Sequence, residues 1–331
     1  MITIDGSIGG GQVLRTALGL SCLLNKPFYI TNIRKNRPNS GLQEQHLQCV
    51  LALAKLSDAE VKGAYKGSAE LYFSPKKINI TSLEIKISTA GSVGLVLQSL
   101  LIVGLKYPLN IKISGGATYG KWAPSIDFID KVFCHWLRKL GMEVKINVIK
   151  HGFYPKGGAE VEVKIKPANS YEKIFITDLG EDKKINIVAV SSNSLRKRNV
   201  LERMVDKAKE ILEKNHKLPI ETQLNYVETI CDGCGITICA NTKNGVVGSS
   251  LSGEIGTPAE DIAKECVNVL LEDLKKFSLD RYSADQIIPY LGLVGGKVRI
   301  PLLTDHIVSN IAVVEKFINS KVSIKENIIE V

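Results

Sequence analysis

The sequence lacks any apolar run approaching the roughly 20 residues that a membrane-spanning helix requires. Its N-terminus, MITIDGSIGG, has neither the basic segment nor the apolar stretch of a secretory signal peptide. Its 331 residues are enough to bury a large core and to form two domains. With a hydrophobic content of 44%, these absences predict a soluble cytoplasmic protein that has no membrane partner.

The cysteines do not form an obvious set of pairs, because there are seven of them. Four lie within apolar helical or strand patterns, which predicts reduced, buried thiols: Cys22, Cys49, Cys134 and Cys266. Cys231 and Cys234 have the CxxC spacing of a zinc or redox site, but no second pair or nearby histidine completes a ligand set. A hairpin turn at Asp232-Gly233 explains the spacing more simply, and we favour it.

Acidic residues are outnumbered, since 34 Asp+Glu stand against 43 Lys+Arg and the net charge is +9. An excess of this sign favours a polyanionic partner, because each phosphate that a protein neutralises releases condensed counterions. Lysines scattered over a solvated surface produce the same total. The charge is therefore compatible with both interpretations.

Strand-like alternation and helical periodicity follow one another along the chain without a low-complexity linker. The first unit is predicted to have the order βαβαββ, with elements at 2–5, 12–24, 28–33, 42–56, 59–63 and 69–73. A second unit has the same order, with elements at 83–88, 91–105, 109–114, 125–140, 143–149 and 159–166. A third begins near Ile174 and is interrupted; it resumes after residue 281 with a helical stretch and elements at 297–301, 306–317 and 321–325. Repetition at about 80 residues predicts three similar α+β units around one axis.

The interruption has an element order of its own. Its elements are predicted to be a strand, a helix, two strands and a helix, at 185–191, 199–213, 222–228, 235–241 and 258–277. We therefore predict a small inserted α/β domain at residues 182–276 with the order β-α-β-β-α. The core domain would then consist of residues 1–181 and 277–331.

Two segments have the residue types of a phosphate site. Gly9-Gly10-Gly11 follows a strand and opens a helix that carries Arg15, and such a loop can present backbone N–H groups to an anion or simply make a tight turn. Arg34 and Arg37 follow the next strand, and arginine binds phosphate bidentately while staying charged. A solvated basic loop is the alternative. His46 shares an apolar helix face, which favours a packed core histidine.

Two further segments are rich in turn-forming residues. Thr89-Ala-Gly91-Ser92 joins a strand to the helix that carries Gln98, and either hydroxyl can cap that helix. His151-Gly152-Phe153-Tyr154-Pro155-Lys156-Gly157-Gly158 predicts a rigid loop between two strands, near which an anion could bind. Gln98 is either a site residue or a polar helix residue.

His306 begins the last predicted helix, after Thr304 and Asp305. The positive end of a helix disfavours imidazolium and keeps a ring nitrogen nucleophilic. A neutral imidazole there can attack an α-phosphate if arginines and a metal ion neutralise the displaced pyrophosphate. The alternative is a histidine that lies at a helix start without a chemical role.

In their order along the chain, these segments resemble the RNA 3′-terminal phosphate cyclase family. The similarity extends over nearly the whole chain, through DGSIGGGQVLRTALGLS, IRKNRPNSGLQEQHL, STAGSVGLVLQ, HGFYPKGGAEVEV, SGEIGTPAE, YSADQ and HIVSNIAVVEKF. The resemblance implies an α+β core of three repeats, each with a four-stranded sheet and two helices, plus a small inserted domain. The organisation predicted above agrees with this fold.

The resemblance also implies a ligase of RNA processing that converts an RNA 3′-phosphate into a 2′,3′-cyclic phosphate. In the family a histidine is adenylylated by ATP through Nε2, AMP passes to the RNA 3′-phosphate, and the adjacent 2′-OH expels AMP. On this sequence that histidine is His306. The implied partners are ATP, RNA with a 3′-terminal phosphate, and a divalent metal, either Mg or Mn.

The family's other site residues transfer to matching positions of this sequence. Tyr282 resembles the residue that stacks on adenine. The remaining residues that resemble the nucleotide site are Gln98, Ser283, Ala284, Asp285 and Gln286. The positions that handle ATP phosphates or the RNA terminal phosphate are Arg15, Arg34, Arg37 and Gln45.

The first motif departs from the family pattern. Only Ser7 and Ile8 separate Gly6 from Gly9, so the usual Gly-Glu pair, whose glutamate helps to bind the metal, is missing. The metal ligands are therefore left unassigned. One alternative is a non-catalytic cyclase-like protein of ribosome biogenesis, but such proteins lack the histidine found here as His306. Another is an enolpyruvyl-transferase-like enzyme, which would need neither that histidine nor an AMP site.

Overall fold

The structure is a computed structural model that describes residues 1–120, 123–215, 217–276 and 278–331. In this part of the chain, strands form four sheets of four strands each. Three of the sheets share one connectivity: the first strand is parallel to the second, and the fourth lies antiparallel between the second and the third. The predicted α+β class is thereby confirmed, as is its repeated core.

The first repeat is covered by two helices, α1 (Gly11–Leu24) and α2 (Glu44–Ser57). Its strands are β1 (Ile2–Asp5), β2 (Phe28–Thr31), β3 (Glu60–Lys62) and β4 (Leu71–Ser74). In β2 and β4 every second side chain is buried, as expected for strands with one face on a core. A short 3-10 helix, Gly6–Ile8, precedes α1 within the predicted glycine loop.

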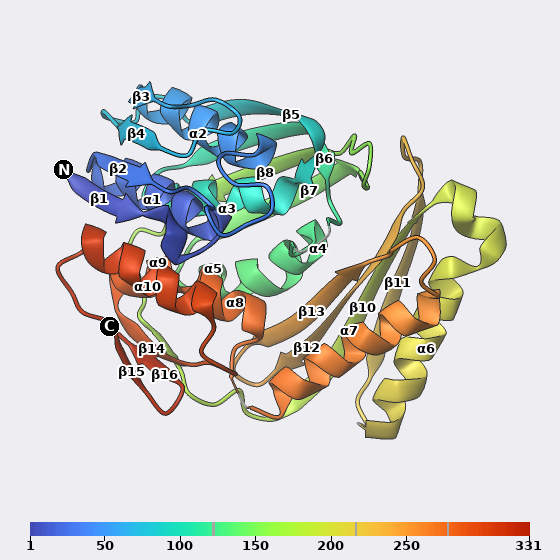
Figure 1. Cartoon of the computed structure of the whole chain (residues 1–331). Coiled ribbons are helices and arrows are strands. Elements are labelled where there is room, and N and C mark those ends of the chain that lie inside the picture. Colours follow the sequence, from blue (N-terminus) through green and yellow to red (C-terminus); the bar gives the residue numbers. More distant parts are fainter. Residues whose placement is uncertain (121–122, 216, 277) are drawn as a thin grey trace.

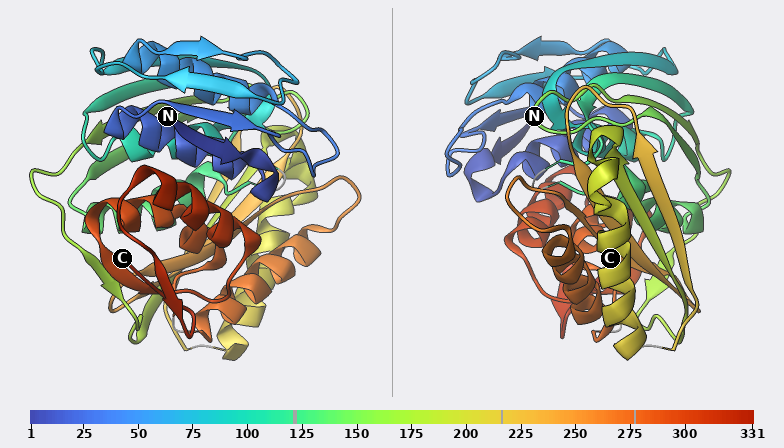
Figure 2. Two further views of the ribbon diagram at one scale, coloured as in Figure 1. Left: turned by 60° about the vertical axis from the view of Figure 1, so that its left-hand side comes forward. Right: turned by 90° about the vertical axis from the view of Figure 1, so that its right-hand side faces the viewer.

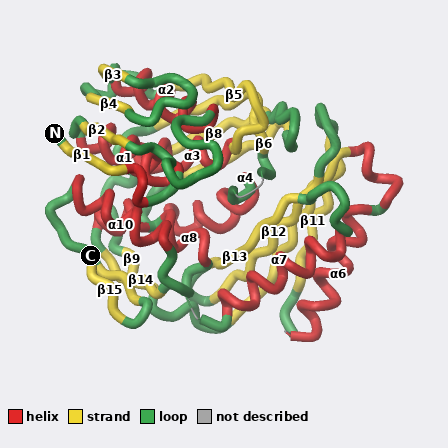
Figure 3. Tube along the Cα trace, in the orientation of Figure 1, coloured by secondary structure: helices red, strands yellow, loops and turns green. Residues whose placement is uncertain are grey.

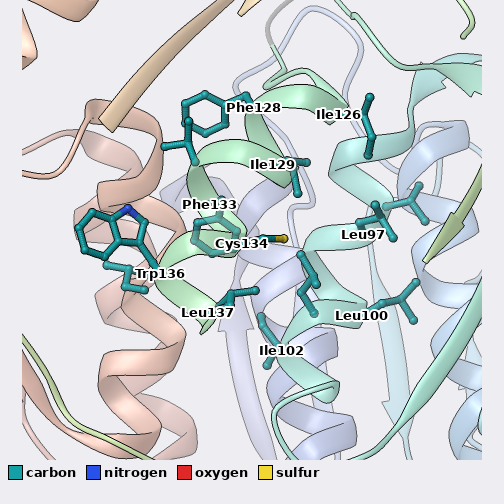
Figure 4. Close-up of a cluster of buried hydrophobic side chains, with 14 of the residues drawn as sticks. Leu97, Leu100, Ile102, Ile126, Phe128, Ile129, Phe133, Cys134, Trp136 and Leu137 are labelled. Carbon is teal, nitrogen blue, oxygen red and sulfur yellow. The ribbon is translucent and has the colours of Figure 1, made fainter. Parts of the chain in front are cut away.

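The second repeat has the same order. Its strands are β5 (Ser82–Ser92), β6 (Leu109–Ala117), β7 (Glu143–Lys150) and β8 (Glu160–Lys166). Its first helix is α3 (Val93–Val103). Its second consists of α4 (Ile126–Phe128), a π-helical turn (Ile129–Phe133) and α5 (Cys134–Lys139). Figure 4 shows that Leu97 and Leu100 of α3 lie on one side of this second helix and Trp136 on the other.

The third repeat is completed after the interruption. Its strands are β9 (Ile174–Ile176), β14 (Gly296–Arg299), β15 (Ser323–Lys325) and β16 (Ile328–Glu330). Its helices are α8 (Arg281–Gln286), α9 (Ile288–Val294) and α10 (Asp305–Phe317). Strand β16 was not predicted, because only three residues pair there after a turn with positive φ at Glu326 and Asn327. In both views of Figure 2 this repeat, in red, lies below the first two.

Helix α1 is the central element of the core. Every residue from Gln12 to Leu23 is buried, because α1 packs against α2, α3 and α10 at once. Gly19 permits the close approach of α3, since a Cβ there would lie 2.9 Å from Ile102. Among the described residues, no helix is both long enough and apolar enough to cross a membrane.

The interrupting segment forms the fourth sheet, whose order β11-β10-β12-β13 differs from that of the three repeats. Its strands are β10 (Asp182–Ser192), β11 (Ile220–Val227), β12 (Cys234–Thr242) and β13 (Val246–Ser252). Two helices, α6 (Val200–Asn215) and α7 (Ala259–Leu274), cover one face. Figures 1 and 3 show the other face turned toward the core.

The predicted order β-α-β-β-α must be corrected to β-α-β-β-β-α, because β13 was missed. Its sequence, VVGSSLS, contains glycine and serines instead of the β-branched alternation that marks a strand. Its first five residues are all buried, since α7 covers one face and the core covers the other. The division into a core domain and an inserted domain stays a prediction.

Glycines on the interrupting segment receive aromatic side chains of the second repeat. A Cβ at Gly245 would lie 2.0 Å from Cη2 of Trp136, and one at Gly235 would lie 2.1 Å from Cδ1 of Tyr119. The Tyr119 hydroxyl is also 3.1 Å from the Thr237 hydroxyl. The two parts of the chain are thus held at a fixed distance by contacts that tolerate no added side-chain atom.

We expect Gly245→Ala to lower the free energy of unfolding by about 1–3 kcal/mol, the usual effect of overpacking. The fully buried Trp136 has no free space into which to move. Urea denaturation measures the change. Gly120→Ala is the control, because a Cβ there would lie an ordinary 3.7 Å from Ser92. Equal stability of the two variants would show that the contact is not tight.

Candidate active site

The predicted nucleophile lies at the start of α10, as its sequence context indicated. His306 is the second residue of this helix, and the Thr304 hydroxyl caps it by accepting a hydrogen bond from the Ile307 N–H at 3.2 Å. The imidazole is 46% exposed, so a ligand can reach it. Helix α10 packs along α1, which brings His306 toward the glycine loop of the first repeat.

One ring nitrogen of His306 is engaged by Asp285. The Nδ1 atom lies 3.2 Å from Oδ2 of this carboxylate, which belongs to α8. When Nδ1–H donates to Asp285, the lone pair of the neutral ring is on Nε2. A carboxylate behind an imidazole fixes the tautomer and the ring orientation. With this tautomer Nε2 is the ring nitrogen that is free to react, and its role as a nucleophile stays a prediction.

Asp285 is itself held by a buried polar network that the sequence analysis missed. Asn310 donates to the backbone carbonyl of Asp285 at 2.9 Å and accepts from the Thr16 hydroxyl at 2.9 Å. Beside it, Gln12 donates to Ser309 at 3.0 Å. The available signal was polar residues three and four positions after His306, on a helix face that is otherwise apolar.

Arg15 and Gln98 form a second polar pair, of which Arg15 is buried. The guanidinium Nε donates to Gln98 Oε1 at 2.8 Å, and Arg15 is only 8% exposed. Burial lowers the pKa of Arg15, whereas the nearby Asp285 carboxylate acts in the opposite direction. The residue carries a charge beside the site with little water around it, which strengthens its attraction for an anion.

Arg34 and Arg37 lie near the glycine loop. Arg34 donates to the backbone carbonyls of Asn39 and Gly41, and its pKa is lowered by partial burial and by the like charge of Arg37. The exposed Arg37 approaches Gly10 so closely that a Cβ there would lie 3.2 Å from its guanidinium. Glycine at position 10 thus leaves room for a cation.

His46 is a buried histidine, as predicted, and it packs against the same loop. Its Nδ1 accepts a hydrogen bond from the Gln43 N–H at 3.2 Å, and the residue is 2% exposed. Burial, and after it the positive charges of Arg15 and Arg34, lower its pKa well below the usual value. His46 is therefore neutral and adds no charge to the arginine cluster.

Gln45 does not join the arginines. Its side-chain oxygen accepts a hydrogen bond from the Ser92 N–H at 3.1 Å, at the junction of β5 and α3. Ser92 in turn caps α3 by accepting from the Leu95 N–H, which agrees with the predicted capping role. The structure therefore gives Gln45 a contact between the first two repeats, and its predicted phosphate contact stays a prediction.

Helix α8 places its site candidates in different surroundings. Ser283 and Ala284 are fully buried, so their predicted contact with a nucleotide stays a prediction. Gln286 donates back to the carbonyl of Tyr282 at 2.9 Å. The Tyr282 ring meets Phe128 edge to face, with 5.6 Å between centroids. The ring is thereby held by the second repeat.

A cavity lies among α1, α3, α8 and α10. It has about 390 Å³ of empty space, part of it open to solvent. Four predicted site residues line it: Arg15, Gln98, Asp285 and Gln286. The network residues Gln12, Thr16 and Asn310 line it as well. The other seven predicted site residues do not belong to its lining: His306, Arg34, Arg37, Gln45, Tyr282, Ser283 and Ala284.

No group of three or more His, Cys, Asp or Glu side chains within the described ranges has the arrangement of a metal site. Among the residues that the structure describes, the only carboxylate in the cavity lining is Asp285, which is already paired with His306. These residues do not form a protein cage for a divalent metal.

Comparison with known proteins gives one consistent match. The family model described as RNA 3′-terminal phosphate cyclase matches residues 7–324. A protein of that name from Pyrococcus abyssi is 39% identical over 323 residues, 96% of this chain and 93% of the relative. Those from Caldivirga maquilingensis and Saccharolobus solfataricus are each 40% identical, covering 97% and 98% of this chain and 94% and 96% of the relatives.

We expect Asn310→Leu to lower the free energy of unfolding by about 1–3 kcal/mol, because the buried Asp285 carbonyl and Thr16 hydroxyl lose their partner. Urea denaturation measures the change. Val308→Ala on the same helix is the control and should change stability by less than about 0.5 kcal/mol, because Val308 is 50% exposed. An unchanged midpoint for Asn310→Leu would show that the network contributes no stability.

We expect Asp280→Asn to remove a pH dependence of stability. Asp280 caps α8 through one carboxylate oxygen, while Oδ2 is buried without a described partner. Burial raises the pKa of Asp280 from 3.8 to about 7 despite the capping bonds, so between these values the folded state binds more protons than the unfolded state. Stability from this group is therefore present at low pH and falls as pH rises toward 7.

Asparagine stays neutral at every pH and can keep the capping bonds. The measurement is urea denaturation at intervals from about pH 4 to pH 8, where Asp280→Asn should give the flatter curve. Parallel curves for the variant and the wild type would contradict a raised pKa at Asp280.

Proposed function

The chain belongs to the RNA 3′-terminal phosphate cyclase family, and we propose that it converts the 3′-terminal phosphate of RNA into a 2′,3′-cyclic phosphate at the expense of ATP. Membership makes it a ligase-type enzyme that acts in RNA processing and uses ATP. The observation that most supports a covalent route is the His306–Asp285 pair, which leaves Nε2 of a reachable imidazole as the nucleophile.

In the first proposed step, Nε2 of His306 attacks the α-phosphorus of ATP. A P–N bond forms, the bond from the α-phosphorus to the bridging oxygen breaks, and pyrophosphate leaves. The ring becomes cationic, and Asp285 stabilises it through Nδ1–H. Arg34 and Arg37 are proposed to neutralise the charge that develops on pyrophosphate, with Arg15 beside them. Tyr282 is proposed to stack on adenine.

The second and third steps transfer and then release AMP. An oxygen of the RNA 3′-phosphate attacks the phosphorus on His306, the P–N bond breaks, and the imidazole returns to its neutral form. The adjacent 2′-OH then attacks the 3′-phosphorus, which closes the cyclic phosphate and expels AMP. The hydroxyl proton is lost to solvent. In the overall reaction, RNA 3′-phosphate and ATP are converted into RNA with a 2′,3′-cyclic phosphate, AMP and pyrophosphate.

A divalent metal, Mg or Mn, stays a prediction. Magnesium in nucleotide sites is commonly held by substrate phosphates with only one or two carboxylates. The described residues do not form a cage for it, and no step above is assigned to it.

Incubation with ATP labelled at the α-phosphate and either metal should leave acid-labile label on the denatured wild-type chain. His306→Ala should carry none, because it lacks the attacking nitrogen. Asp285→Asn should be labelled about 10²- to 10⁴-fold more slowly, since the ring loses its orienting carboxylate. Val308→Ala, exposed on the same helix, is the control that keeps wild-type labelling.

The second measurement follows an RNA with a 3′-phosphate, whose end should become resistant to phosphatase. Absence of label on the wild type with either metal would contradict the covalent route. In that case the non-catalytic, cyclase-like role in ribosome biogenesis would become the better explanation. Equal labelling of wild type and His306→Ala would place the nucleophile elsewhere.

A further inference from the structure

A group of four exposed cations and one exposed tyrosine lies away from the cavity, where the second repeat meets the interrupting segment. We call the group the basic rim; its residues are Tyr154, Lys156, Arg196, Lys197 and Arg198. The first two belong to the loop between β7 and β8, and the others to the 3-10 helix Asn193–Arg198 that follows β10. All five are exposed, and Tyr154 is exposed to 74%.

The two parts of the basic rim are joined by the turn between β11 and β12. On one side, the Cys231 thiol donates to the carbonyl of Phe153, and Ile230 lies against Gly158. On the other side, the Gly233 N–H donates to the Ser192 hydroxyl at 3.3 Å, directly before the 3-10 helix. Figure 1 shows the loop and the turn next to each other beyond the ends of β7 and β11. Both parts of the rim therefore flank the same turn.

The cations of the basic rim lie among three carboxylates that keep their negative charge. In the described structure, Lys156, Lys197 and Arg198 make no ion pair, and the carboxylates close by accept hydrogen bonds from neutral donors. Asp232 accepts from Ser194, Glu228 from Asn193, and Glu202 from Tyr226. Arg196 instead stacks over the ring of Tyr226 at 4.6 Å from its centroid.

The composition of the basic rim suits single-stranded nucleic acid. Lysine and arginine neutralise backbone phosphates, and an exposed tyrosine offers a ring on which a base can stack. Tyr154 has no described aromatic neighbour.

A series of packed segments lies between the loop of the rim and the candidate active site. A Cβ at Gly157 would lie 3.0 Å from the carbonyl of Thr89, at the end of β5. Three residues further on, the Ser92 N–H donates to Gln45 of α2. The next residue of α2 is His46, which packs against the glycine loop of the site.

We propose that the basic rim binds the body of the RNA substrate, several nucleotides upstream of the 3′-phosphate that reacts at His306. This inference rests on the proposed function, since it assumes that the 3′ end lies in the candidate active site. The interrupting segment then contributes to the choice of substrate: the rim favours long single strands over short ones without touching the reacting atoms.

The test compares Lys197→Glu/Arg198→Glu and Tyr154→Ala with the control Lys321→Glu/Lys325→Glu, whose lysines are exposed in and beside β15 on the opposite end of the molecule. Binding is measured by fluorescence anisotropy with two 3′-phosphorylated RNAs. One has about 20 nucleotides, more than the roughly 4–16 that a single-strand site covers, and the other is a dinucleotide.

The charge-reversal variant should bind the long RNA at least about 10-fold more weakly, and its slope of log affinity against log salt should fall by about 0.7 for each lost phosphate contact. Tyr154→Ala should lose about 5- to 100-fold, with less change in the salt slope. Affinity for the dinucleotide should be unchanged in every variant. The control should match the wild type except for a small uniform loss.

Labelling by ATP in the absence of RNA separates this inference from the proposed function. The rim variants should be labelled like the wild type, which also shows that they fold. The inference would be overturned if the rim variants bound the long RNA as tightly as the control variant does. It would also be overturned if they lost equal affinity for the dinucleotide and the long RNA. If the wild type took up no label but its binding of long RNA still depended on the rim, the covalent route would be contradicted and the inference about the basic rim would be supported.

Discussion

The site depends on the packing of α1 against α10, two helices at opposite ends of the chain. Helix α1 supplies Gln12, Arg15 and Thr16, and α10 supplies His306 and Asn310. Apolar contacts alone would allow these helices to slide past each other, because such contacts are not directional. The bonds from Gln12 to Ser309 and from Thr16 to Asn310 fix one register. That register places Asp285 behind the imidazole.

The arginines around the glycine loop impose an electrostatic cost when no anion is bound. Arg15 is buried, Arg34 is partly buried, and the like charge of Arg37 lowers the pKa of Arg34. Gln98 and a set of backbone carbonyls accept their hydrogen bonds, but these partners carry no full negative charge. A polyphosphate would remove the repulsion and gain from the low local dielectric. Keeping His46 neutral prevents the repulsion from becoming larger.

The sequence was most informative where chemistry and periodicity coincide. The position of His306 at a helix start and the burial of His46 follow from local patterns. Side-chain contacts between segments far apart in the sequence could not be predicted, because neither residue of such a pair identifies the other. In the sequence, Asn310 is only a polar residue within a predicted helix. Its contact with Thr16 depends on the packing of the third repeat against the first. Gln45 was assigned by resemblance to phosphate handling, whereas its bond to Ser92 depends on how α2 packs beside β5.

The segment from Gly6 to Gly11 lacks the Gly-Glu pair of the family pattern, so the region around the glycine loop has one carboxylate fewer. A loop with the additional Gly-Glu pair would add a carboxylate near the arginines. Here Gln12, Arg37 and His46 fill the space above Gly9, Gly10 and Gly11, where an added Cβ would lie within 3.2 Å of one of these side chains. None of these three is acidic, and Asp285 is occupied by His306. The described site is therefore strongly cationic, so a metal that arrives with the nucleotide would be held mainly by phosphate oxygens. In the proposed reaction, the missing glutamate would then affect selection of the metal more than attraction of the triphosphate.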